Sequence, residues 1–95
     1  MENNENKLEK HTAELTNWHV FYGNLYGKTK DSVKFADGTN IITSTIVNVD
    51  KLSDRFIVET LNTIYTCRFD SVASIDKVTS DELYAELKDA IGRFM

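Results

Sequence analysis

One cysteine and two histidines are the side chains best suited to nucleophilic or metal chemistry in this sequence. The cysteine is Cys67, and the histidines are His11 and His19. A thiol beside an imidazole can form a nucleophile and its base, and the same side chains are common zinc ligands. A structural zinc site needs about four ligands with paired spacing, whereas the chain has a single cysteine. We therefore predict no metal site, no disulfide and no oxidising compartment.

Acidic side chains are plentiful, but no pair has a spacing that fixes two carboxylates on one surface for acid and base catalysis. Asp50 with Asp54, and Asp37 with Glu59, are typical of turns and solvated faces. The glycines do not form the G-x-x-x-x-G-K or G-x-G-x-x-G spacing of a phosphate-binding loop. We therefore predict that the protein is not an enzyme and has no cofactor.

An aromatic stretch followed by lysines is the strongest candidate for a binding surface. It comprises Trp18, His19, Phe21, Tyr22 and Tyr26, followed by Lys28, Lys30 and Lys34. Aromatic rings on a strand flanked by lysines are what stacking on single-stranded bases requires. The alternative is that the rings fill the core and the lysines keep an edge strand in solution. The sequence leaves both interpretations open.

Composition limits the class of protein. The chain of 95 residues is long enough for one domain, and its 41% hydrophobic and 27% charged residues are typical of a globular protein. A net charge of -4 argues against sequence-independent binding to a phosphate backbone. Residues 1–10 lack the apolar segment of a secretory signal, and no apolar run reaches the roughly 20 residues of a membrane span. We expect a cytoplasmic protein that does not enter a membrane.

The first part of the chain predicts a change from tail to strand. Residues 1–17 are polar, and Leu8, Ala13 and Leu15 can share one face of a weak helix. From Trp18 onward the residues become β-branched and aromatic, which favours a strand. We expect ordered β-structure to begin at that residue.

A first hairpin is predicted around Asp37-Gly38, because a type I′ turn accepts both residues. The strand before it would carry the alternating apolar residues Val33 and Phe35. The run after it, residues 39–49, is longer than one flat strand usually is, and its apolar residues change phase. A one-residue bulge or a sharp bend within this run explains both properties.

A second hairpin is predicted over residues 56–69, with a register that follows from its turn. A two-residue turn at residues 61 and 62 fixes which residues face each other. One face then carries Phe56, Val58, Tyr65, Cys67 and Phe69. The other face carries Ile57 and Ile64 among polar residues. A cysteine on the first face acts as a small buried hydrophobe.

The C-terminal residues predict a helix. Thr79 and Glu82 form a capping box, with Val78 and Leu83 at the flanking hydrophobic positions. An apolar stripe follows at helical spacing, formed by Leu83, Leu87, Ala90, Ile91 and Phe94. This stripe must dock on an apolar surface, either over Ile57 and Ile64 or at the mouth of a barrel.

Together these elements predict a mainly β protein of the α+β kind. We expect a small antiparallel SH3-like barrel of five to six strands with a C-terminal α-helix and a weak N-terminal helix. The tail or weak helix would span residues 1–17, and the barrel, including a last short strand over 72–75, residues 18–78. The helix over residues 79–95 would pack on the barrel in a single domain.

The order of strands between Ser32 and Phe69 resembles that of Sm-like RNA-binding proteins. The stretches that carry the resemblance are SVKFADG at 32–38, IVNVD at 46–50 and FIVETLNTIYTCRF at 56–69. The resemblance implies a small ring-forming barrel that contacts RNA through its loops. The matching positions are Asn48 and Asp50 in one loop and Arg68 and Asp70 in another.

Three functions are compatible with these patterns. The first is a non-catalytic module that binds a protein, or itself as a homodimer, through Ile57, Ile64, Trp18, Tyr22 and Tyr26. The second is a small acidic inhibitor from a phage or mobile element that occupies the nucleic-acid-binding groove of a host protein. The third is an Sm-like or single-stranded nucleic-acid-binding protein that uses Trp18, Phe21, Tyr22, Lys28, Lys30 and Lys34. The first is preferred, because the apolar strand surface exceeds what one small core and one helix can bury.

Overall fold

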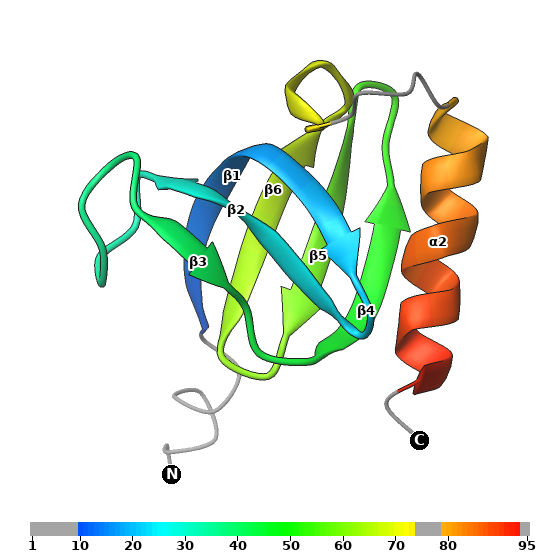
Figure 1. Cartoon of the computed structure of the whole chain (residues 1–95), viewed down its shortest axis with the longest axis horizontal. Coiled ribbons are helices and arrows are strands. Elements are labelled where there is room, and N and C mark those ends of the chain that lie inside the picture. The colour runs from blue at the N-terminus through cyan, green and yellow to red at the C-terminus, as the bar shows by residue number, and fades with distance from the viewer. Residues whose placement is uncertain (1–9, 74–78, 94–95) are drawn as a thin grey trace, which may run out of the picture.

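A computed structural model describes residues 10–73 and 79–93, with side chains as far as residue 91. This part of the chain forms one sheet followed by one helix (Figure 1). The strands are β1 (His11–Phe21), β2 (Asn24–Lys30), β3 (Asn40–Ile42), β4 (Ile46–Lys51), β5 (Arg55–Thr60) and β6 (Thr63–Arg68). A short 3-10 helix, η1 (Phe69–Ser71), precedes the helix α2 (Ser80–Arg93).

The six strands form one mixed sheet in the order β3-β2-β1-β6-β5-β4. Neighbouring strands are antiparallel except β1 and β6, which pair in parallel from His11 with Thr63 to Leu15 with Cys67. The prediction of an antiparallel sheet is therefore wrong at its centre. The sheet is open, with β3 and β4 as its edges, so the predicted closed barrel is not confirmed.

The predicted weak helix before Trp18 is wrong for the described residues, because residues 11–21 form β1. Ala13 and Leu15 are both buried, two positions apart, which is the period of a strand. This strand is hard to recognise in the sequence, because alternate residues are polar and face solvent and few of its residues before Trp18 are apolar. Leu8 lies outside the described residues.

The first predicted hairpin exists, but with different boundaries. β2 pairs with β3, and residues 31–39 connect them, so the predicted strand with Val33 and Phe35 is wrong. Gly38 has a φ of +87°, whereas Asp37 is not in the left-handed region that a type I′ turn requires. The connection is held by hydrogen bonds from the Gly38 amide to the Thr29 carbonyl and from the Thr29 amide to the Thr39 carbonyl.

The predicted bend in residues 39–49 is confirmed. β3 ends at Ile42, β4 begins at Ile46, and the register with β5 shifts between Ile46 and Asn48. Ile46 and Val49 are buried on either side of this shift, whereas Ile42 faces solvent. The bend thus carries the chain from one edge of the sheet to the other.

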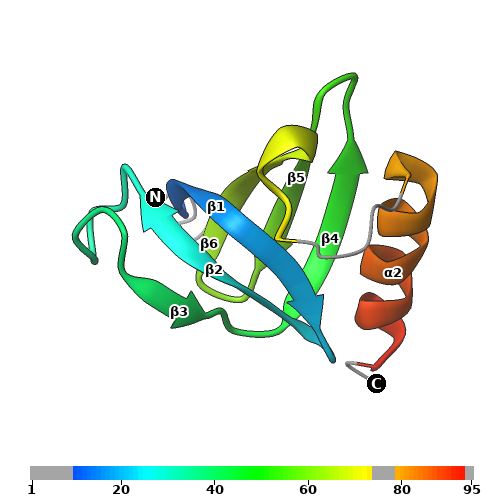
Figure 2. The ribbon, with the colours of Figure 1, turned by 45° about the horizontal axis from the view of Figure 1, so that its top comes forward.

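The register predicted for the second hairpin is confirmed. Phe56 pairs with Cys67, and Val58 pairs with Tyr65. All four of these side chains are buried. Figure 2 shows β5 and β6 side by side within the sheet. Of the predicted last strand over 72–75, the described residues form a single β-bridge between Val72 and Trp18. Residues 74 and 75 lie outside the described residues.

The C-terminal helix is confirmed together with its capping box. The Glu82 amide donates to the Thr79 hydroxyl at 3.1 Å, and the Thr79 amide donates to the Glu82 carboxylate at 2.9 Å. Leu83, Leu87 and Ala90 are buried, while Val78 and Phe94 lie outside the residues whose side chains are described.

The helix covers the Phe56 face of the sheet and not the Ile57 and Ile64 face. The Tyr84 ring stacks on the Phe56 ring, with centroids 6.1 Å apart. Figures 1 and 2 show α2 beside β4. Trp18 completes this core, because its ring meets Phe56 edge-to-face at 6.0 Å and its Nε1 donates to the Arg68 carbonyl at 2.8 Å.

Candidate binding surface

Trp18 is fully buried, so its predicted place in either binding surface is wrong. The cause is a β-bulge in β1, where Asn17 adopts a φ of +51° and the register with β2 shifts between Thr16 and His19. Because a bulge inserts one extra residue, the side chains after it change phase. Leu15 and Trp18 therefore both point into the core.

The remaining aromatic residues gather on the outer side of β1, β2 and β3. We call this the aromatic surface, and it comprises His19, Phe21, Tyr22, Tyr26 and Ile42. Register places His19 beside Tyr26 and Tyr26 beside Ile42. The His19 ring lies 5.1 Å from the Tyr26 ring, and the Phe21 ring lies 5.0 Å from the Tyr22 ring. Phe21 is 45% exposed, Ile42 57% and Tyr22 72%, so the surface is both apolar and accessible.

Tyr22 occupies an uncommon backbone conformation. It lies between β1 and β2 with a φ of +57°. A left-handed conformation costs a bulky residue roughly 1–2 kcal/mol, which glycine, asparagine or aspartate would largely avoid. Tyr22 is 72% exposed and, among the ring contacts of the described residues, its ring meets only the Phe21 ring, and such backbone strain is often found at functional sites.

Lys28 and Lys30 continue the outer side of β2 beyond Tyr26 and are exposed, as is Lys34 in the connection to β3. No carboxylate of the described residues forms an ion pair with any of the three. Alternation along β2 places Tyr26, Lys28 and Lys30 on one side of the sheet, whereas Lys34 lies in the connection beyond the strand.

Ile57 and Ile64 do not join the aromatic surface. Both are half-buried on β5 and β6. Ile57 pairs with Asp50 and Thr66, and Ile64 pairs with Glu59 and Thr12, so each is surrounded by polar neighbours. These isoleucines thus lie on the face of the β5–β6 pair opposite Phe56, on other strands than the aromatic surface.

The positions singled out by the Sm-like resemblance are not gathered at loops. Asn48 and Asp50 lie within β4. Arg68 ends β6, where it faces Asp54 at 3.7 Å and Asp70 at 3.4 Å. Hydrogen bonds from Arg55 hold the pKa of Asp54 below its usual value. The two arginines at this end of the sheet are thus already paired with carboxylates.

Cys67 and His19 cannot act together, because Cys67 points into the core whereas His19 lies on the aromatic surface. Burial, with a smaller contribution from the Glu14 charge, raises the pKa of the Cys67 thiol far above its usual value. Within residues 10–73 and 79–93, no three histidine, cysteine or acidic side chains are close enough to hold a metal ion.

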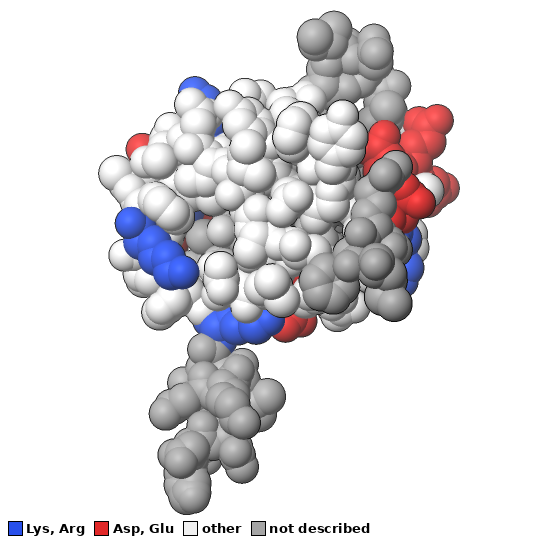
Figure 3. All heavy atoms as spheres, turned by 60° about the horizontal axis from the view of Figure 1, so that its bottom comes forward, with Lys and Arg blue, Asp and Glu red and all other residues white. Residues whose placement is uncertain are grey.

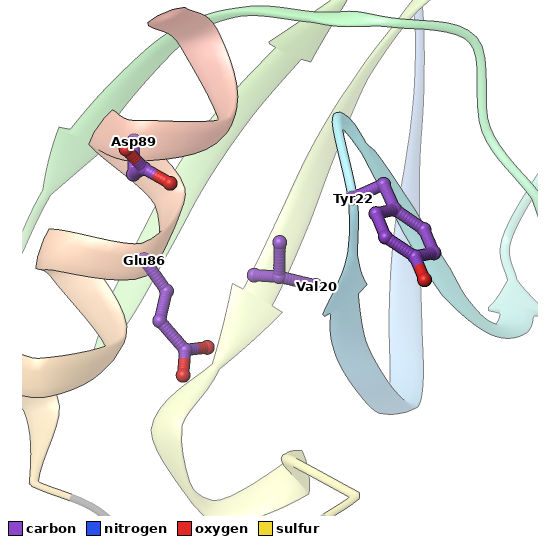
Figure 4. Close-up of a pocket in the computed structure, with 4 residues that line it drawn as sticks. All are labelled: Val20, Tyr22, Glu86 and Asp89. Carbon is purple, nitrogen blue, oxygen red and sulfur yellow. The ribbon is translucent and has the colours of Figure 1, made fainter. Parts of the chain in front are cut away.

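Two hollows border the aromatic surface. The first lies between the β1–β2 turn and α2, has a volume of about 210 Å³, and is lined by Val20, Tyr22, Glu86 and Asp89. Figure 4 shows Glu86 extending from the helix towards Val20, while the Tyr22 ring is directed away from the helix. Among the described residues, the lining of this hollow contains no cysteine, serine, lysine or histidine.

The second hollow, which we call the β3 groove, has a volume of about 110 Å³. Its walls come from β3, from the connections on either side of β3 and from the β5–β6 turn, and they comprise Lys34, Phe35, Ile41, Ile42, Ser44, Asn62, Thr63 and Tyr65. The Ser44 hydroxyl is buried and has no hydrogen-bond partner among the residues that the structure describes. Sequence reasoning missed this site, because the bend that brings Ser44 towards the β5–β6 turn carries no motif.

Figure 3 shows that one broad face of the molecule carries few charged side chains, and that acidic side chains gather on the side where α2 lies. No helix in the described residues is long and apolar enough to cross a membrane. Comparison of the chain with protein-family models, with curated proteins and with solved structures finds no match. The function proposed below therefore rests on the arrangement of the side chains.

Proposed function

We propose that the protein is a non-catalytic module that binds another protein through the aromatic surface. One observation carries this proposal: of seven large apolar side chains that are exposed in the described residues, five lie between residues 21 and 42. These are Phe21, Tyr22, Val33, Phe35 and Ile42. Phe21, Tyr22 and Ile42 belong to the aromatic surface, and an exposed apolar surface of this kind is typical of a protein-interaction site.

The residue types also support a protein partner. Tyrosine and phenylalanine are enriched in the cores of protein interfaces, where they bury a large area with little loss of side-chain entropy. The rings of Phe21 and Tyr22 support each other edge-to-face, which keeps them ordered while exposed. A partner would therefore bind a surface that is largely preformed.

The same proposal gives the curved sheet a role. We infer that the sheet is an open half-barrel of the SH3-like kind. Its two edge strands, β3 and β4, do not pair with each other and are linked by the bend at residues 43–45. The Thr43 amide donates to the Leu25 carbonyl, the Ile46 amide to the Gly23 carbonyl, and the Leu61 amide to the Thr45 carbonyl. These bonds fix the bend to β2 and the β1–β2 turn on one side and to the β5–β6 turn on the other, which supports a rigid platform.

Affinity capture with matched variants tests the proposal. The wild-type chain, a Phe21→Ser/Tyr22→Asn variant and an Ile57→Thr variant would each be immobilised and exposed to extract from the native host. We expect wild type and Ile57→Thr to retain the same stoichiometric protein, and the double variant to lose it. A nuclease-resistant set of bound proteins that is identical for all three chains would refute the aromatic surface as the site.

A second candidate function has one observation in its favour. Tyr26, Lys28 and Lys30 alternate along the outer side of β2, so one aromatic ring and two lysines without carboxylate partners in the described residues stand in a line. This arrangement suits a single-stranded nucleic acid. Fluorescence anisotropy with a labelled oligonucleotide at low salt measures it. We would expect binding that weakens steeply with salt, and a flat titration at high micromolar protein would remove this candidate.

A further inference from the structure

We propose that the free edge of β3 accepts an extended segment of the partner protein as an additional strand. The segment would place an apolar side chain in the β3 groove and an acidic side chain beside Lys34. This inference rests on the proposed protein-binding function and specifies how the partner is held. Backbone pairing, the shape of the groove and the local charge each support it.

The hydrogen-bond pattern between β2 and β3 leaves one side of β3 unused. The Thr29 amide donates to the Thr39 carbonyl at 2.9 Å, and the Thr43 amide donates to the Leu25 carbonyl at 2.8 Å. In an antiparallel pair, bonded and non-bonded positions alternate. Asn40 and Ile42, which lie between these residues, therefore direct their amide and carbonyl groups away from β2, towards the free edge.

This edge is accessible, unlike the opposite edge of the sheet. Asn40 and Ile42 are both exposed, whereas β4 at the other edge packs against α2. Natural proteins usually protect an exposed edge strand, because its unpaired groups recruit further strands. Here the edge carries an exposed isoleucine and no proline, so it resembles a site of strand addition.

The β3 groove runs beside this edge and supplies a place for a side chain. Its volume of about 110 Å³ is somewhat smaller than the roughly 150 Å³ apolar cavity that accepts a benzene ring, so it suits one aliphatic side chain. Phe35, Ile41 and Tyr65 give it apolar walls. Ser44 also lines the groove, although its hydroxyl oxygen is itself buried.

Charge indicates the chemistry of the segment. Lys34 lines the groove, and no acidic residue does. Lys28 lies opposite Asn40 on the neighbouring strand, so a second ammonium group stands near the same edge. An aspartate or glutamate next to the apolar residue of the segment would meet two lysines that have no carboxylate partner within the described residues.

Proline at position 42 separates strand addition from other modes of binding. Ile42 makes no backbone hydrogen bond to β2 in this register, so Ile42→Pro removes an outward amide without breaking the β2–β3 pairing. Ile42→Thr is the matched control, because it shortens the side chain and keeps the amide. Lys34→Glu, at an exposed loop position, tests the charge independently in case the proline variant fails to fold.

The experiment is selection of a random library of linear peptides on the immobilised full-length chain, followed by titration of enriched peptides. We expect peptides that share an apolar residue next to an acidic one. Their Kd should rise about tenfold in Ile42→Pro, which corresponds to about one hydrogen bond of roughly 1.4 kcal/mol. It should rise at least as much in Lys34→Glu, and the tenfold rise in Ile42→Pro is measured relative to Ile42→Thr, which also lacks the isoleucine side chain but keeps the amide.

Three other outcomes would overturn the inference. Absence of enriched peptides refutes strand addition and leaves the capture result on the aromatic surface intact. Peptides whose Kd rises in Phe21→Ser/Tyr22→Asn but not in Ile42→Pro support the proposed function. They would place the bound peptide on the aromatic surface and not on the β3 edge. A dimer in sedimentation that Ile42→Pro dissociates would identify a second copy, and not a partner peptide, as the occupant of the edge.

Discussion

The two hairpins of the sheet differ in what they do with their apolar side chains. In the β5–β6 hairpin, a two-residue turn joins strands on which Phe56, Val58, Tyr65 and Cys67 face inward and are buried, while Ile57 and Ile64 on the other side are half-buried. In the β2–β3 hairpin, a long connection joins strands whose outer side exposes Tyr26 in part and Ile42 largely. One hairpin builds the core, whereas the other presents a surface.

The difference follows from position in the sheet. β5 and β6 belong to the half of the sheet nearer the helix, where the rings of Trp18 and Tyr84 pack against Phe56. β2 and β3 lie at the far edge, where the described residues add no further layer over their outer side (Figure 1). The proposed function thus places recognition in the half of the sheet opposite to the one that builds the core around Phe56, and substitutions can test this division.

Phe56→Ala should have the largest effect on stability. Phe56 is fully buried and contacts the rings of Trp18, Phe69 and Tyr84. Loss of a buried phenylalanine costs about 3–5 kcal/mol, which is a large share of the roughly 5–15 kcal/mol that stabilises a domain. Urea unfolding followed by tryptophan fluorescence measures it. A loss below about 1 kcal/mol would contradict the assignment of this hairpin to the core.

Gly27→Ala should have the next largest effect, although Gly27 lies in the β2–β3 hairpin. Asn17 and Trp18 of the bulge oppose Gly27, and an added Cβ would lie 3.0 Å from the Trp18 Cβ and 3.1 Å from the Thr16 carbonyl oxygen. Such overpacking against backbone costs about 1–3 kcal/mol. Gly38→Ala is the comparison, because its added Cβ meets nothing within 4 Å and its cost reports the φ of +87° alone. Equal unfolding midpoints for Gly27→Ala and wild type would show that the bulge can shift freely.

The pH dependence of stability should report the buried thiol of the β5–β6 hairpin. Burial raises the pKa of Cys67 in the folded state, so the folded protein keeps the proton that the unfolded chain loses above about pH 8.5. The free energy of unfolding should therefore fall by about 1.4 kcal/mol per pH unit above that value. Urea titrations between about pH 7.5 and pH 10 measure it. Cys67→Ala should remove this slope, and a slope that persists in the variant would assign it to another group.

Substitutions on the aromatic surface should have the smallest effect on stability. Tyr22→Asn relieves the strain of the φ of +57° but loses the ring contact with Phe21, so the free energy of unfolding should change by less than about 1 kcal/mol or rise. Thermal unfolding measures it, with Ile42→Thr as a companion. A loss above about 1.5 kcal/mol in both variants would mean that this surface supports the fold, and the proposed division would fail.

The parts of the fold that the sequence predicts well are local. The β5–β6 register follows from a two-residue turn and strict alternation, and the α2 start follows from a capping box four residues long. The parallel pairing of β1 with β6 joins residues 52 positions apart, and no local pattern specifies it. The position of Trp18 depended on a bulge at Asn17, which reverses the phase of the strand without a glycine to mark it.

The binding surface shows the same limit. Phe21, Tyr22 and the three lysines were identified from residue type, because aromatic and basic residues carry their chemistry with them. Ile42, Phe35 and Ser44 became recognisable through the bend between β3 and β4, which places them around one groove. Long-range geometry, and not composition, decides which ordinary residues border such a groove.

The central place of β1 has a consequence for how the chain is made. Synthesis delivers β1 first, but its partner β6 emerges about 50 residues later, and the two halves of the sheet meet along this pair. Closing so long a loop costs entropy before any contact compensates it. During translation β1 has the β2–β3 hairpin alone as a partner, so the nascent chain displays an unpaired strand edge until the last strand leaves the ribosome. Such an edge is where a nascent-chain chaperone or a misplaced strand would bind.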